Sequence, residues 1–461
     1  MDWSFLAELA VVLVVIAIGA RQGGIALGLW GGVGVLILTL VFGADPAAPP
    51  IDVMLIILAV ISATAAMEAA GGIDWLVGVA ERIIRRFPQH ITIVAPLVSY
   101  MFTFGAGTGH VFYPLLPVIH DVAHDNGIRP ERPIAVATIA SQQAITASPV
   151  SAAMAALLVI LEPEGMTLIG IMAIAVPATL IGVITAAVLS YRRGIELADD
   201  PVFQERVAQG LVEPIPELGE HGPLRGSAAE AAAPVHVESA EEEGTTRTGR
   251  ISALLFLAGV ASIIVLGAFP ELRPLVGPEG EEVRLDMSVT IEITMLTVAA
   301  LIVTITGVEV ERIPRTASAR AGLVALVGIF GLAWLGQTLI DNNLEVVVGS
   351  LTDMVTTAPW TFAIGLFLAS ILLFSQAATT RALMPLGVAL GIGAPQLVAM
   401  WPAVNGYFFL PTYGTLIAAI NFDLSGTTRI GRFVLNHSFM MPGMVATVVA
   451  IASGLAISGF V

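Results

Sequence analysis

The chain of 461 residues contains no cysteine and no lysine, and only 12% of its residues are charged. Without cysteine it has no disulfides, no thiolate metal sites and no cysteine nucleophile. All 20 basic residues are arginines, and they form no basic patch of the kind that nucleic-acid binding needs. Soluble domains carry roughly 25% charged residues. A composition with 56% hydrophobic residues and a mean hydropathy of +0.89 therefore excludes an ordinary soluble globule.

Sequence motifs for nucleotide binding and for catalysis are missing as well. No G-x-x-x-x-G-K-[ST] run occurs, which argues against an ATP-driven pump on this chain. The alternating glycines at 105–109 lack the strand and helix context of a dinucleotide fingerprint. No residue set pairs a nucleophile with a base at an interpretable spacing. We therefore expect no enzymatic activity, no cofactor, no bound metal and no nucleic-acid partner.

Long apolar runs, in contrast, occur along most of the chain. A helix needs roughly 20 apolar residues to cross the hydrocarbon core of a bilayer. We predict an all-α polytopic membrane protein with about ten transmembrane helices. The predicted spans are 5–20, 24–42, 51–69, 134–160, 166–191, 251–269, 288–308, 321–340, 395–420 and 433–460.

Two further apolar stretches contain polar interruptions and do not fit single spans. Residues 91–126 hold a Gly-rich run at 105–109, and residues 360–393 hold the polar run 375–380. We predict that each stretch forms a re-entrant hairpin, in which two half-length helices meet at a polar tip. The spans at 134–160 and 395–420 also contain polar runs, so we predict that they are broken helices.

The arginines support this arrangement through the positive-inside rule. With the N-terminus outside and both hairpins returning to the side they entered, 17 of the 20 arginines lie inside. Arg273 and Arg284 then lie outside, and Arg381 lies within the membrane. If residues 91–126 formed a full span instead, every later loop would be assigned to the opposite side of the membrane. We therefore expect both termini on the periplasmic, extracellular side.

The two halves of the chain repeat one order of elements from opposite sides of the membrane. Residues 1–193 and 251–461 each read as three spans, a short amphipathic segment, a hairpin, a broken helix and a span. The amphipathic segments are 73–87 and 344–355. Inverted repeats with hairpins and broken helices are typical of secondary transporters whose site lies at the midplane.

Residues 194–250 connect the two repeats. From 194 to 249 there are 12 acidic and 3 basic residues, which gives −9 of the net charge of −16. The Ala, Glu, Pro and Gly content of this segment provides no apolar face to bury. We expect an acidic, disordered cytoplasmic linker.

The polar interruptions at the two tips and the two breaks form the candidate binding site. Irregular backbone at membrane depth is tolerated only where it is buried or lines a wet cavity. Helix N-termini there carry a partial positive charge and unpaired N–H groups, which suits a carboxylate without a buried lysine. The candidate substrate-binding residues are Gly107, Thr108, Gly109, His110, Thr146, Ser148, Pro149, Ser375, Gln376, Thr379, Thr380, Arg381, Asn405, Pro411, Thr412 and Tyr413.

Several of these residues have an alternative role. Each Ser or Thr could instead bond to its own helix, although clustering at four symmetric breaks favours binding. Arg381 either clamps a carboxylate or extends to the outer surface. His110 either contacts substrate, carries a proton or caps a helix. Glu68, at the end of an apolar span, is either a proton carrier or a structural acceptor.

Eight short motifs in both halves resemble those of the anaerobic C4-dicarboxylate uptake (Dcu) transporters. The motifs span residues 20–28, 51–54, 105–110, 128–133, 146–151, 410–413, 422–428 and 431–438. The resemblance implies a bacterial inner-membrane carrier that exchanges fumarate, malate or aspartate for succinate. It also implies a scaffold domain, a hairpin-bearing transport domain, a homodimer and an elevator motion in the lipid bilayer.

Two alternatives to dicarboxylate exchange stay open. One is a cation-coupled carrier of another carboxylate or of an amino acid. The other is a transport-deficient membrane signalling protein with a sensor partner. The acidic linker suggests the second, as do Ile371 and Leu416, which stand where the family often has Lys and Asp.

Overall fold

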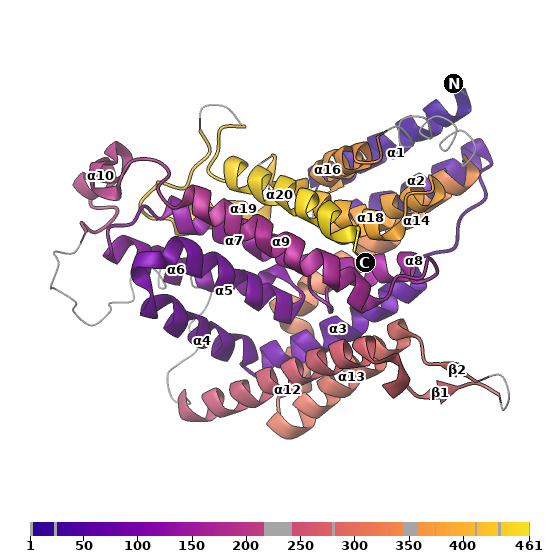
Figure 1. Ribbon diagram of the computed structural model, residues 1–461, viewed down its shortest axis with the longest axis horizontal. Coiled ribbons are helices and arrows are strands. Elements are labelled where there is room, and N and C mark those ends of the chain that lie inside the picture. The colour runs from indigo at the N-terminus through magenta and orange to yellow at the C-terminus, as the bar shows by residue number, and fades with distance from the viewer. Residues whose placement is uncertain are drawn as a thin grey trace.

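The computed structural model describes residues 3–22, 25–215, 242–278, 282–343, 358–373, 375–410, 413–431 and 435–460. These ranges are mostly helical (Figure 1). They also contain a short antiparallel ribbon that pairs β1 (Leu275–Val276) with β2 (Val283–Arg284). The predicted all-α fold class is confirmed.

Within the described ranges, six helices are long and apolar enough to cross a membrane. They are α3 (Ile51–Ala69), α9 (Leu168–Ser190), α12 (Glu242–Ala268), α13 (Met287–Thr306), α14 (Ala317–Asn342) and α20 (Met440–Ser458). Shorter apolar segments lie in α1 (Trp3–Gln22), α2 (Ala26–Phe42), α8 (Ala152–Leu161) and α16 (Thr361–Leu373). Several of these helices also expose large apolar side chains, such as Leu40 and Leu58. A helix that is apolar all round fits a lipid environment.

One group of helices packs around α3. It contains α4 (Gly72–Arg86), α12 and α13, and α12 and α13 lie side by side along the lower edge of Figure 1. A neighbouring group contains α1, α2 and α14. The axes of α2 and α14 approach closely, since a Cβ on Gly331 would lie 1.7 Å from the Gly28 carbonyl oxygen. Only glycine fits this crossing, a common device for packing membrane helices.

A further group contains α5 (Ile91–Ala106), α7 (Glu131–Ile145), α9 and α20, which contact one another. Two helix pairs occupy the interrupted stretches 91–126 and 360–393. In the first, α5 leads through η2 (Gly109–Phe112) to α6 (Leu115–Asp125), and in the second α16 leads to α17 (Gln376–Ala389). The two helices of each pair contact each other.

Two interrupted helices follow these pairs in the chain. The first is α7, which ends at Ile145 before α8 begins at Ala152. The second is α18 (Ala394–Met400), which continues as η6 (Trp401–Phe408) and is followed by α19 (Gly414–Phe422). A serine caps the start of α8, because Ser151 Oγ accepts a hydrogen bond of 3.0 Å from Met154 N.

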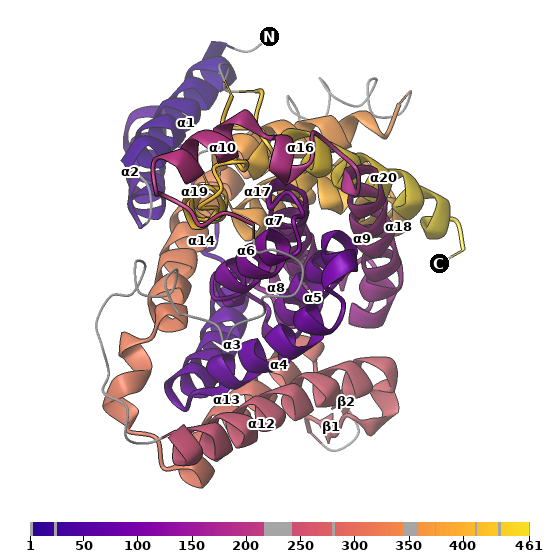
Figure 2. The ribbon, with the colours of Figure 1, turned by 90° about the vertical axis from the view of Figure 1, so that its left-hand side faces the viewer.

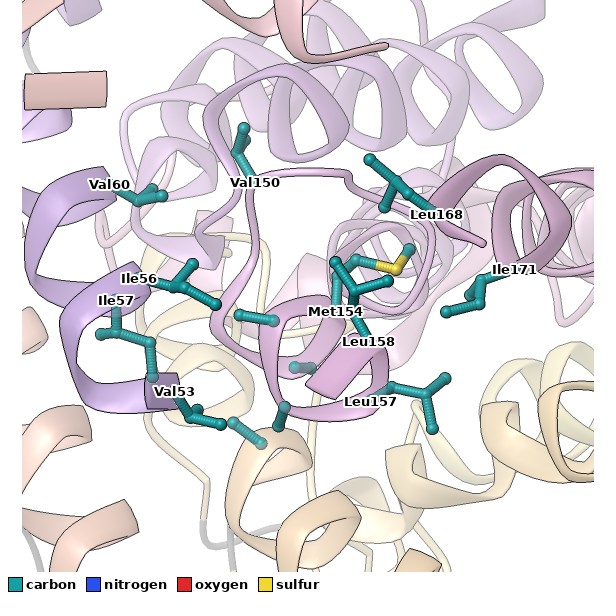
Figure 3. Packing of buried hydrophobic residues seen from close by; sticks show 14 of the residues in the cluster. Val53, Ile56, Ile57, Val60, Val150, Met154, Leu157, Leu158, Leu168 and Ile171 are labelled. Carbon is teal, nitrogen blue, oxygen red and sulfur yellow. The ribbon is translucent and has the colours of Figure 1, made fainter. Parts of the chain in front are cut away.

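The largest apolar core surrounds α8. The side chain of Ile56 on α3 extends toward α8, which carries Met154 and Leu157, and Leu168 and Ile171 of α9 approach from another side (Figure 3). Contacts of α8 with α13 and α17 join the two halves of the chain.

Part of the connector between the halves has helical structure. Residues within the stretch expected to be disordered form η3 (Leu197–Asp199) and α10 (Pro201–Ala208), at the end of the molecule that faces the viewer in Figure 2. Asp200 caps α10, and Phe203 is buried against the protein. Residues 216–241, and the amphipathic segment expected near 344–355, lie outside the described residues.

Candidate functional site

A cavity of about 620 Å³ lies between α3 and α14 on one side and the helix interruptions on the other. The interrupted side contributes the tip after α5, the end of α7, and the first residues of α8, α17 and α19. No Asp, Glu or Arg side chain is among the described residues that line it. The described lining is therefore mostly apolar, with a few uncharged polar groups.

Six of the predicted site residues line this cavity. Both tips contribute, together with the residue that precedes α19. These residues are Gly107, Thr108, Gly109, Ser375, Gln376 and Tyr413. The fold therefore brings together segments that are far apart in the sequence.

Other predicted residues are buried outside the cavity lining. They are Thr146, Ser148, Pro149, Thr379, Thr380 and Asn405. Three of the hydroxyls bond to their own helix, since Thr146 donates to Gln143 O at 2.8 Å, Thr379 to Ser375 O at 2.8 Å and Thr380 to Gln376 O at 2.7 Å. Pro411, Thr412 and the side chain of His110 lie outside the described residues.

Arg381 is half-buried on α17 and is not among the residues that line the cavity. Among the described residues, Asp52 in the first turn of α3 is the carboxylate that interacts with it electrostatically. No ion pair of Arg381 occurs among the described residues, so this interaction acts over a longer distance.

Three helix N-termini open onto the cavity. The first residues of α8, α17 and α19 all contribute to its lining, and Ser375 Oγ caps α17 by accepting from Ala378 N at 3.2 Å. The first turn of a helix leaves backbone N–H groups without intrahelical acceptors and carries about half a positive charge. Together these ends create a positive potential in a cavity whose described lining residues include no Arg.

A fourth helix N-terminus, that of α14, is already occupied. The carboxylate of Glu68 accepts hydrogen bonds from Ala317 N at 2.9 Å and Ser318 N at 2.8 Å. Glu68 therefore acts as a structural acceptor that neutralises this end.

Three of the polar lining residues outside the predicted set are Gln142, Ser318 and Thr415. Gln142 is 1% exposed and accepts a hydrogen bond of 3.1 Å from Gln376 Nε2. The hydroxyls of Ser318 and Thr415 are buried without a hydrogen-bond partner in the described part of the chain. Gln142 and Thr415 belong to the polar runs at the two breaks, so the sequence pattern could have indicated them. Nothing in the sequence indicated Ser318, because it faces the cavity from a separate span.

A second polar cluster joins the middle of α6 to the loop that follows α19. The buried Asp423 carboxylate accepts from Ser425 N at 3.0 Å, Thr427 Oγ1 at 2.9 Å and Thr428 N at 2.6 Å. His120 Nδ1 lies 3.4 Å from the same carboxylate. Burial by itself raises the pKa of Asp423, but the imidazole and the hydrogen bonds outweigh it and lower the pKa to about 2. Asp423 therefore stays ionised and organises the loop after α19.

The connector is attached to the start of α7 by ion pairs. Arg129 pairs with Asp200 and, at 2.6 Å, with Glu131. Arg132 pairs with Glu196 at 3.1 Å. Burial lowers the pKa of Arg129, but the two carboxylates outweigh it and raise the pKa.

Solved structures with a similar fold are membrane transporters. The YdaH transporter of Alcanivorax borkumensis has a TM-score of 0.53 at 15% identity, covering 100% of this chain and 98% of that protein. MtrF of Neisseria gonorrhoeae, described as one of a class of antimetabolite efflux pumps, has a TM-score of 0.53 at 13% identity, covering 99% of this chain and 94% of that protein. With its long apolar helices, the chain is a multi-pass membrane protein with the fold of a transporter.

Sequence comparison identifies the particular family. The profile of the anaerobic C4-dicarboxylate membrane transporters matches residues 4–461. DcuB of Escherichia coli O6:H1 is 39% identical over 455 residues, covering 98% of this chain and 97% of that protein. DcuA of Wolinella succinogenes is 39% identical over 457 residues, covering 98% of both. The chain therefore belongs to the family of anaerobic C4-dicarboxylate membrane transporters, as its motifs indicated, and it is a carrier rather than an enzyme.

Proposed function

We propose that this carrier exchanges C4-dicarboxylates, namely fumarate, malate, aspartate and succinate, across the bacterial inner membrane. The substrate occupies the cavity between α3, α14 and the helix interruptions. The observation that carries this proposal is the meeting of three helix N-termini in a cavity that the described residues line without any charged side chain.

The positive potential of the helix N-termini around the cavity supports a dianionic substrate. Each helix N-terminus supplies about half a positive charge and free N–H donors, so three of them complement about one and a half negative charges. Ser375 and Thr415 add hydroxyl groups to the same lining. A volume of about 620 Å³ accommodates a four-carbon diacid together with bound water.

We propose an elevator-type movement for the transport step. The wall that α14 contributes consists mainly of small or apolar residues, including Ala321, Gly322, Ala325 and Gly328. A wall without large polar groups forms few specific bonds with the opposite side and offers little resistance to sliding. In this mechanism α3 and α14 stay in place, while the tips and breaks carry the substrate.

Exchange of labelled succinate in proteoliposomes tests the proposal. Vesicles loaded with unlabelled fumarate, malate or aspartate should take up external succinate faster than empty vesicles or vesicles without protein. Uptake that needs a sodium or proton gradient and shows no stimulation from internal dicarboxylate would indicate a cation-coupled carrier instead. No uptake under either condition would overturn the proposed function.

A further inference from the structure

A chain of side-chain amides begins at the cavity lining and continues into the protein behind it. It runs from Gln142 through Gln376 and Asn405 to Gln143, and each of these residues is at most 6% exposed. Gln143 Nε2 extends the chain to Thr447 Oγ1 at 3.1 Å. These amides come from both halves of the sequence, so their hydrogen bonds form only in the folded protein.

A backbone carbonyl sets the direction of these hydrogen bonds. Pro402 O can only accept, and it takes a hydrogen bond of 3.2 Å from Asn405 Nδ2. The same nitrogen donates to Gln143 Oε1 at 3.3 Å. Asn405 Oδ1 is consequently turned toward Gln376, from whose Nε2 it accepts at 3.2 Å.

The orientation of the Gln376 amide in turn fixes that of Gln142. Gln376 Nε2 donates its second hydrogen bond to Gln142 Oε1 at 3.1 Å, which uses both of its N–H groups. Gln142 must therefore point its own Nε2 away from Gln376.

The Nε2 atom of Gln142 packs against the first tip of the cavity. A Cβ built on Gly109 would lie 2.5 Å from this nitrogen, and both residues line the cavity. In the part of the chain that the structure describes, no group accepts a hydrogen bond from Gln142 Nε2. The amide thus presents two unused donors that are accessible from the substrate cavity.

We propose that Gln142 Nε2 donates to one carboxylate of the transported substrate, and that Gln376 and Asn405 are positioning residues that hold this donor toward the cavity. The inference rests on the proposed function and assigns a specificity-determining residue to it. An N–H₂ group cannot accept, so this position favours a carboxylate oxygen and disfavours an ammonium group.

Succinate binding to the full-length protein in detergent, measured by isothermal titration calorimetry, tests this role. Gln142→Met keeps the length of the side chain but removes the donor. One hydrogen bond to a charged group corresponds to a rise in Kd of about 10- to 150-fold. Gln142→Glu should weaken binding further, because a carboxylate would then face the substrate carboxylate. The control Gln337→Met, which removes an amide bonded to Asp341 outside the cavity lining, should leave Kd unchanged.

Gly109→Ala provides an independent variant that leaves Gln142 in the sequence. The three atoms nearest to a Cβ at this position belong to Gln142, so the added methyl group should displace that amide first. Kd should rise in the native background and stay unchanged when Gly109→Ala is added to Gln142→Met. This variant keeps the inference testable if Gln142→Met fails to fold.

The positioning role of Gln376 is tested by a double-mutant cycle. Gln376→Met should raise Kd in the native background but have little further effect in the Gln142→Met background, because it acts through Gln142. Additive effects would overturn the positioning role.

Failure of the proposed function and failure of this inference would give different results. If the native protein does not bind succinate, the proposed function fails. If the native protein binds succinate and both Gln142→Met and Gly109→Ala bind within about twofold of it, this inference is wrong and the proposed function stands.

Discussion

Glu68 at the end of α3 accepts a hydrogen bond of 2.8 Å from the backbone N–H of Ser318 at the start of α14. The contact joins two helices that form one wall of the cavity, across 250 residues of sequence. It places the Ser318 side chain at the cavity and leaves the hydroxyl of that residue unbonded within the described structure.

Replacement of Glu68 separates a structural role from proton transfer. Glu68→Ala should lower the stability by about 1 to 2 kcal/mol, because the N-terminus of α14 loses a charged cap. Glu68→Gln should cost less and should retain succinate exchange, since an amide oxygen still accepts. Thermal unfolding in detergent and proteoliposome exchange measure the two effects. Loss of exchange in a stable Glu68→Gln protein would instead indicate a proton carrier.

The pKa of Asp423 predicts how stability depends on acid pH. A carboxyl group whose pKa falls from 3.8 to about 2 on folding contributes stability above pH 4, and this contribution is lost as the pH falls toward 2. The contribution is about 2 kcal/mol. Asp423→Asn should therefore lower the unfolding temperature at pH 6 and reduce its dependence on pH between 4 and 2. An unchanged pH dependence in the variant would contradict this role.

The ion pair between Arg129 and Asp200 should hold the connector against α7. Asp200→Asn keeps a residue that caps α10 well but removes the charge. We expect a loss of about 2 kcal/mol, the value for a hydrogen bond between charged groups, and faster proteolytic cleavage within 194–215. Asp199→Asn is a matched control, because Asp199 is exposed and has no ion pair in the described structure. Equal behaviour of the two variants would refute the attachment.

The crossing of α2 and α14 predicts a difference between two neighbouring glycines. A Cβ on Gly31 would lie 2.3 Å from the Gly331 carbonyl carbon, whereas a Cβ on Gly32 would meet nothing within 4 Å. Gly31→Ala should force the helices apart and cost about 1 to 3 kcal/mol. Gly32→Ala should be neutral or slightly stabilising, because alanine favours a helix. Equal unfolding temperatures for the two variants would show that the helices do not pack this closely.

Replacement of 216–241 distinguishes a carrier from a signalling protein. A Gly–Ser segment of equal length leaves the ion pairs of Arg129 and Arg132 unchanged, since Asp200 and Glu196 lie outside it. We expect the variant to exchange succinate at the native rate. Native exchange with altered signalling in cells would assign the segment to a sensor partner, whereas lost exchange would show that transport depends on it.

Much of the fold could be predicted because it follows from local chemistry. Apolar runs of sufficient length form helices wherever the backbone must satisfy its own hydrogen bonds in lipid. The start of α8 at Ala152 and that of α17 at Gln376 follow serines, which cap helices well. The described part of the connector differs from expectation because Asp200 caps α10 and pairs with Arg129, a contact that composition does not reveal.

The site was harder to predict, because polarity alone does not say which way a side chain points. Thr146 and Gln142 belong to one polar run at the end of α7, yet only Gln142 lines the cavity. Thr146 lies behind it and bonds to the Gln143 carbonyl. The rotation of α7 decides this difference, and that rotation depends on packing against α5, α9 and α20.

The sequence by itself therefore determined the membrane environment, the positions of the helix interruptions and the family, because each depends on local composition or on short motifs. Only the tertiary structure decided that the wall opposite the interruptions comes from α3 and α14 and that Arg381 lies outside the cavity lining. The physical reason is that these properties arise from contacts between distant segments. The hydrogen bond from Gln376 to Gln142 spans 234 residues, and it turns the Gln142 amide toward the cavity.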